Sequence, residues 1–128
     1  MRYLADTHLL IWFGLFPEKL SLSARVIFED QRNELIFSTA SIWEAAIKYN
    51  LRPKDFPKTP DNLRRELLQN QFEELPVLGE HALAMIGMPP IHKDPFDRML
   101  IAQAMVEGIT LLTSDTKIAQ YPGPILVV

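Results

Sequence analysis

Residues 94–115 read DPFDRMLIAQAMVEGITLLTSD and begin with a well-delimited helix. Asp94 is a favoured N-cap residue, and Pro95 suits the first helical position because a proline there loses no hydrogen bond. Gly108 is a typical residue to end a helix. These signals predict a helix over residues 95–107.

A short apolar strand is expected directly after this helix, over residues 109–113. The same alternation of strands and helices extends through the rest of the chain. Further strands are expected at 2–5, 34–38 and 125–128, helices at 7–16, 21–30, 41–50, 61–70 and 79–86, and a loop at 56–60. The strands are continuous apolar runs, including the last, which we expect to be buried. This pattern predicts an α/β fold with a central parallel sheet covered by helices on both faces, formed as a single domain over residues 1–128.

The composition is that of an ordinary globular protein, with 48% apolar and 23% charged residues in 128. The chain has no cysteine, which excludes a disulfide framework and a thiolate metal site and suits a reducing cytoplasm. Its apolar runs are too short to span a bilayer, so no membrane association is expected.

The net charge of −3 counts mildly against binding to a polyanion. Residues 48–65, however, carry a net charge of +4, from six basic and two acidic side chains. This segment is either a patch that contacts phosphates or a solvated surface, and charge alone leaves both interpretations open.

Four carboxylates stand where strands end or helices begin: Asp6, Glu44, Asp97 and Asp115. Each has a structural explanation of its own. Asp6 could cap the first helix, Asp97 could interact with a helix dipole, and Asp115 could cap a turn. Glu44 stands three residues after Ser41, which is the spacing of a capping box.

The shared position of these acids favours a second explanation. In open parallel sheets, ligands bind beyond the carboxyl ends of the strands, and all four acids can reach that edge. Crowded carboxylates repel one another unless a cation holds them, and Mg²⁺ prefers oxygen ligands. A metal held there could activate water and stabilise charge on a phosphodiester.

The order of these motifs resembles the PIN-domain ribonucleases, and within them the VapC-like toxins of bacterial toxin–antitoxin pairs. The segments that carry the resemblance are DTHLLIW from Asp6, SIWEAAIK around Glu44, HKDPFDRMLIAQA around Asp97 and LLTSD up to Asp115. Together they extend over nearly the whole chain, and the block DPFDRMLIAQA followed by TSD is the most specific part.

The resemblance implies a three-layer α/β/α domain whose acids bind Mg²⁺ or Mn²⁺ and hydrolyse RNA. It makes Asp6, Glu44, Asp97 and Asp115 both the catalytic residues and the metal ligands. Thr113 matches a hydroxyl residue that often lines the site. The expected partners are an RNA substrate, a small antitoxin protein and a second copy of the chain.

Several residues keep two interpretations. Asp94 is expected to be a cap first and a supporting group second. Arg98 could touch RNA or form an ordinary ion pair, and Lys48 and Arg52 are possible RNA contacts in the basic segment. His92, which lies five residues before Asp97, could be a group at the edge of the site that contacts phosphate, but an ordinary loop histidine is the favoured interpretation.

Two other functions fit parts of the sequence. A non-catalytic RNA-binding module could use the basic segment 48–65 and leave RNA intact. A phosphatase or phosphoacceptor domain would also bind Mg²⁺, but a phosphatase with an Asp-x-Asp loop needs an aspartate at position 8, which is His8.

Overall fold

The computed structural model describes all 128 residues and contains one five-stranded sheet whose strands are all parallel. The strands are β1 (Arg2–Ala5), β2 (Glu34–Ser38), β3 (Glu73–Leu75), β4 (Thr110–Thr113) and β5 (Ile125–Val127), in the spatial order β3-β2-β1-β4-β5. The strands β2 and β3 therefore lie on one side of β1, and β4 and β5 lie on the other. This reversal places a topological switch point between β1 and β4.

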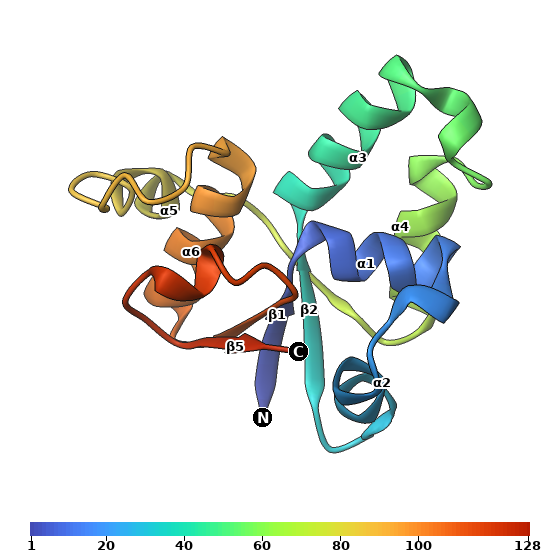
Figure 1. The fold of residues 1–128 in the computed structure, drawn as a ribbon, viewed down its shortest axis with the longest axis horizontal. Coiled ribbons are helices and arrows are strands. Elements are labelled where there is room, and N and C mark those ends of the chain that lie inside the picture. The colour runs from blue at the N-terminus through green and yellow to red at the C-terminus, as the bar shows by residue number, and fades with distance from the viewer.

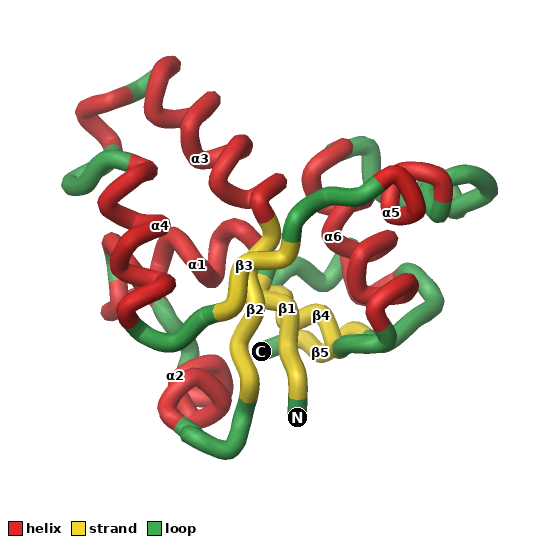
Figure 2. The backbone as a smooth tube through the Cα atoms, turned by 180° about the vertical axis from the view of Figure 1, so that it is seen from behind, coloured by secondary structure: helices red, strands yellow, loops and turns green.

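Helices cover both faces of this sheet (Figures 1 and 2). They are α1 (Thr7–Leu15), α2 (Leu22–Glu29), α3 (Thr39–Leu51), α4 (Pro60–Gln69), α5 (Gly79–Leu83) and α6 (Pro95–Glu107), with 3₁₀ turns η1 (Pro17–Lys19), η2 (Pro53–Asp55) and η3 (Ile118–Gln120). None of these helices has both the length and the apolar character needed to cross a membrane.

Two buried clusters of apolar side chains separate the layers. Successive residues of a strand point to opposite faces, so Ala5 packs with α1, α2 and α4, whereas Leu4 packs with α6 and η3. The helix α3 projects from the carboxyl end of β2, above the sheet (Figure 1). The predicted α/β fold with three layers is confirmed.

The structure differs from the sequence prediction mainly at the two sheet edges. The edge strand β3 was not predicted, because Glu73 and Glu74 break the apolar pattern. The strand at the other edge was predicted and is present, but its expected burial is wrong, since Leu126 and Val127 are 40% and 42% exposed. An edge strand has a neighbour on one side only, so its side chains are less completely covered.

The helices match the predicted ranges closely, with two informative exceptions. The predicted start of a helix at Ser41 is late, because Ser38 is the N-cap of α3 and its hydroxyl accepts from the Ala40 amide at 3.0 Å. The helix α5 ends at Leu83, whereas the prediction extended it to residue 86.

Candidate active site

The acids lie beyond the carboxyl ends of the strands, around the switch point. Asp6 follows β1 directly, and Thr113 is the last residue of the neighbouring strand β4. The Thr113 hydroxyl donates to Oδ2 of Asp6, and both side chains are buried. This bond joins the ends of the two strands, as expected if Thr113 supports the site.

Asp6 is both a helix cap and a buried acid. Its Oδ1 accepts from the Leu9 amide at 2.9 Å, which caps α1, and only 1% of the residue is exposed. Burial raises the pKa of Asp6, while the hydrogen bonds from Thr113 and Leu9 oppose that rise. The structural and functional explanations of Asp6 are therefore compatible.

Glu44 has no capping role, so the capping-box interpretation is wrong. Because α3 begins at Thr39, Glu44 lies in its second turn, where backbone groups are already paired. The residue is 5% exposed, and its Oε2 is 2.9 Å from Nζ of Lys48. Its other oxygen, Oε1, is buried and has no hydrogen-bond partner. A buried carboxylate oxygen without a donor is a natural ligand for a cation.

Asp94 and Asp97 share the start of α6. Oδ1 of Asp94 accepts from the amides of Phe96 and Asp97 at 2.8 and 3.1 Å, so Asp94 is the predicted N-cap. Burial, together with the charges of Asp94, Glu44 and Asp6, raises the pKa of Asp97 to about 7. The site therefore contains acids from β1, α3 and α6 within electrostatic reach of one another.

His92 connects this group to Asp115. Its Nε2 lies 3.1 Å from Oδ2 of Asp97 and 3.2 Å from Oδ2 of Asp115. The residue is in a loop, as the favoured interpretation had it, and it also lies between two of the acids, which neither interpretation predicted. The close spacing of His92 to Asp94 and Asp97 was the only local signal.

The three basic residues proposed as RNA contacts have different surroundings. Lys48 is paired with Glu44, as described above. Arg52 follows the end of α3, about 12 Å farther along the helix axis than Glu44, so it is not part of the acidic group. Arg98 donates to the Pro89 carbonyl at 3.2 Å and to the Tyr121 hydroxyl at 3.1 Å, which ties its guanidinium to the neighbouring loop.

The donor atoms in this site suit a hard divalent cation. Carboxylate oxygens from Asp6, Glu44, Asp97 and Asp115 are available, and no thiolate is present in the chain. A cation would give the unpaired oxygen of Glu44 a partner. It would also offset the repulsion that helps to raise the pKa of Asp97. Mg²⁺ and Mn²⁺ fit this donor set.

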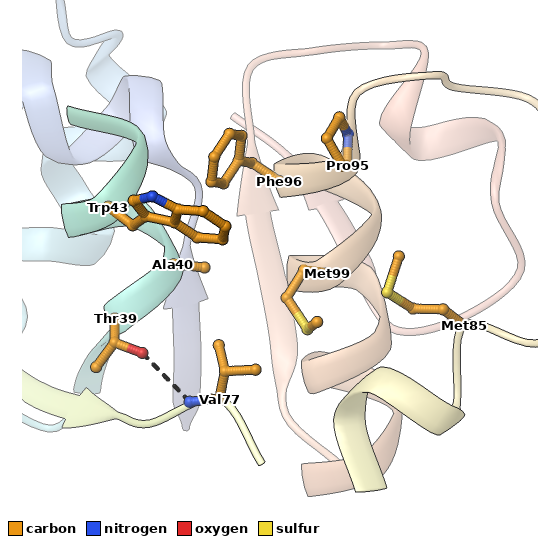
Figure 3. Close-up of a pocket in the computed structure, with 8 residues that line it drawn as sticks. All are labelled: Thr39, Ala40, Trp43, Val77, Met85, Pro95, Phe96 and Met99. Carbon is orange, nitrogen blue, oxygen red and sulfur yellow. Dashed lines mark hydrogen bonds between the residues drawn. The ribbon is translucent and has the colours of Figure 1, made fainter. Parts of the chain in front are cut away.

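An apolar pocket of about 520 Å³ lies between α3 and α6, and none of the four acids lines it (Figure 3). Trp43 and Phe96, which directly precede Glu44 and Asp97 in the chain, form one side of it, with ring centroids 5.1 Å apart at an edge-on angle of 78°. Met85, Met99 and Val77 contribute further apolar surface. The acidic site therefore stands next to an uncovered apolar surface between α3 and α6.

The fold is shared with solved structures of toxin–antitoxin complexes. The chain is similar to a chain of the Rickettsia felis VapBC2 complex bound to a promoter DNA fragment (TM-score 0.69, 11% identity, 99% of this chain and 98% of that one). It is also similar to a chain of a Klebsiella pneumoniae toxin–antitoxin complex (TM-score 0.68, 17% identity, 98% and 96%). A third is VapBC-1 from nontypeable Haemophilus influenzae (TM-score 0.61, 18% identity, 94% and 91%).

No curated protein matches the chain. Residues 3–124 match the family model of the PIN domain, which extends over almost the entire chain and includes all four acids. The chain therefore belongs to the PIN domain family.

Proposed function

We propose that this protein is a metal-dependent endoribonuclease. The observation that carries the proposal is the buried group of Asp6, Glu44 and Asp97 at the carboxyl edge of a parallel sheet, with one Glu44 oxygen left without a donor. Asp115 completes the set of proposed ligands. Membership of the PIN domain family supports nuclease chemistry, and the oxygen donors favour Mg²⁺ or Mn²⁺.

The proposed reaction is hydrolysis of a phosphodiester bond. A water oxygen bonds to phosphorus, one P–O ester bond breaks, and the departing oxygen takes up a proton. A bound divalent cation would supply charge stabilisation and a more acidic water. The carboxylates would hold that cation and orient the attacking water, and Asp6 would be kept in place by Thr113 and the start of α1.

Cleavage of a labelled RNA by the purified protein tests this proposal. We expect cleavage with Mn²⁺ or Mg²⁺ and none with EDTA. Asp6→Ala and Asp97→Asn should each remove most of the activity. Undiminished cleavage by both variants would contradict the mechanism.

We further propose that the protein is the toxin of a toxin–antitoxin pair and acts in the cytoplasm, where its RNA substrate would be found. The support is structural likeness to chains from three such complexes. Expression of the chain alone should then arrest growth, and co-expression of its antitoxin should restore it. Growth arrest by Asp97→Asn at equal protein level would contradict this proposal.

A homodimer is also proposed, and the surface of α3 supports it. Trp43, Ile47 and Leu51 follow one another at intervals of four residues and are 65%, 39% and 75% exposed. This spacing aligns them on one side of the helix, and Trp43 also lines the pocket in Figure 3. An uncovered apolar stripe of this kind is typical of a protein interface.

The alternative of a non-catalytic RNA-binding module is less well supported. Three of the six basic side chains in residues 48–65 are paired with glutamates: Lys48 with Glu44, Lys58 with Glu66 and Arg64 with Glu74. Their charge is thus partly neutralised. RNA binding that persists in EDTA, without cleavage under any metal, would favour this alternative.

A further inference from the structure

His92 occupies a position between two of the proposed metal ligands. We propose that His92 is a positioning residue of the metal site, whose Nε2–H group donates a hydrogen bond to Asp115 and lies against Asp97, so that the two carboxylates face each other. This inference rests on the proposed function, since it concerns the same site. The contacts that support it are the distances from Nε2 to Oδ2 of Asp115, 3.2 Å, and to Oδ2 of Asp97, 3.1 Å.

The other ring nitrogen fixes which atom carries the proton. The backbone amide of Asp94 donates to Nδ1 of His92 at 3.2 Å, so Nδ1 acts as an acceptor and bears no hydrogen. The hydrogen of the imidazole is then on Nε2, which faces the two carboxylates. A nitrogen that carries a hydrogen has no lone pair for a metal, so His92 contributes a hydrogen bond to the ligands and does not bind the ion itself.

The backbone of His92 is held firmly from the opposite side. Its amide donates to the Tyr121 hydroxyl at 2.7 Å, and that hydroxyl donates to the His92 carbonyl at 3.3 Å. Arg98 adds bonds to the same carbonyl at 3.4 Å and to the Tyr121 hydroxyl at 3.1 Å. Because Tyr121 is 4% exposed, these bonds anchor the backbone of His92 to the core around η3, and this fixes where its ring begins.

Because His92 is held in place, its ring can fix the orientation of Asp115 and Asp97. Oδ1 of Asp115 accepts from the Lys117 amide at 2.8 Å, and its Oδ2 faces His92, so the carboxylate is held at both oxygens. A hydrogen-bond donor placed between Asp115 and Asp97 also offsets the repulsion between two like charges. The ligands would therefore be oriented before the cation arrives, and partners that orient ligands commonly change metal affinity by 10- to 100-fold.

Binding of Mn²⁺ in the absence of RNA tests this role, measured by isothermal titration calorimetry. His92→Phe keeps the ring shape but removes both nitrogens, and we expect it to weaken Mn²⁺ binding about 10- to 100-fold. His92→Gln can place an N–H group near the position of Nε2, and we expect affinity within about threefold of the original, on the same physical grounds. His8→Phe is the matched histidine substitution, because His8 is exposed, makes no hydrogen bond to an acid and acts on Asp6 through its charge alone; we expect a smaller change than at His92.

A spectroscopic measurement separates positioning from direct ligation. Electron spin-echo spectra of the Mn²⁺ complex should lack the ¹⁴N coupling of a directly bound imidazole, and detection of that coupling would overturn the proposal. Equal Mn²⁺ affinity in the folded His92→Phe variant would also overturn it, while leaving the nuclease proposal intact. If the unaltered protein bound no Mn²⁺ at all, both proposals would fail. Thermal melting would verify that each variant is folded.

Discussion

The carboxyl group of Asp97 lies in the first turn of α6 with 13% of its side chain exposed. Burial and the charges of neighbouring acids together raise its pKa from an ordinary 3.8 to about 7. Between these two values the folded protein holds a proton at Asp97 that the unfolded chain has released. The stabilisation from this group is therefore fully present below about pH 4 and is lost as the pH rises to 7.

Asp97→Asn should consequently stabilise the protein without metal. An asparagine cannot ionise, so the variant avoids the loss that the aspartate undergoes. A shift of this size corresponds to at most about 4 kcal/mol, and we expect a gain on the order of 2 kcal/mol in the free energy of unfolding at pH 8. Urea unfolding in EDTA at several pH values measures this gain, which should shrink towards pH 4. A variant less stable than the original at pH 8 would contradict the argument.

The hydroxyl of Thr113 stabilises the fold through its hydrogen bond to Asp6. Thr113→Val keeps the shape of the side chain but leaves the buried Asp6 carboxylate without one of its donors and the Asp115 amide without its acceptor. We expect a loss of about 1–3 kcal/mol in the free energy of unfolding, measured with urea. Thr110→Val in the same strand is the control, because Thr110 is only partly buried; an equal loss there would show that the contact with Asp6 is unimportant.

The residues of the candidate site differ in how far the sequence could reveal them. Asp6 and Asp97 were predicted because each follows a local signal, the end of a strand or a helix cap. The proximity of His92 to Asp115 could not be predicted, since 23 residues separate them and their meeting depends on the packing of a loop against Tyr121. Glu44 was assigned a competing role because the Ser41 spacing imitates a capping box.

The residue that ends α6, Gly108, contributes to the stability of the fold through its backbone conformation. Gly108 follows α6 with φ of +67°, a left-handed conformation that side chains other than glycine disfavour. Gly108→Ala should cost about 1 kcal/mol of stability. Gly79→Ala is a matched control, because an added Cβ meets no atom within 4 Å at either position and Gly79 lacks a positive φ. Thermal unfolding of both variants tests this, and equal effects would contradict it.

At the level of elements, local signals predicted α6 at its observed bounds, Pro95–Glu107, because its cap, first-turn proline and final glycine are all short-range features. The edge strand β3 lacks such signals. Its pairing with β2 depends on where the chain leaves α4, and Glu73 and Glu74 give no apolar alternation. Tertiary context, which the sequence pattern does not carry, decides such strands.

The whole molecule gathers its acids through topology. Because all strands are parallel, their carboxyl ends share one edge, and the reversal of strand order between β1 and β4 leaves room there for Asp6, Thr113 and the start of α6. The net charge of −3 is therefore compatible with a polyanionic substrate, since a bound cation would reverse the sign of the local charge.

The apolar surface of α3, formed by Trp43, Ile47 and Leu51, is the proposed dimer interface. Trp43 lies at the end of this surface nearest α6, packed edge-on against Phe96 and 65% exposed in the single chain (Figure 3). In a twofold dimer the same surface meets itself, so one glutamate per chain places two like charges in an apolar interface. We therefore expect the unaltered protein to sediment as a dimer at micromolar concentration, and Trp43→Glu to sediment as a monomer.

A matched variant distinguishes this surface from general apolar exposure. Leu22 on α2 is 79% exposed, and α2 lies at the opposite end of the molecule from α3 (Figure 1), so Leu22→Glu should leave the dimer intact. Dissociation by both substitutions would mean that the interface is not confined to α3. A monomeric unaltered protein would remove the homodimer proposal and leave the stripe of Trp43, Ile47 and Leu51 to be covered by a different partner, since an apolar stripe of this extent is rarely left in contact with water.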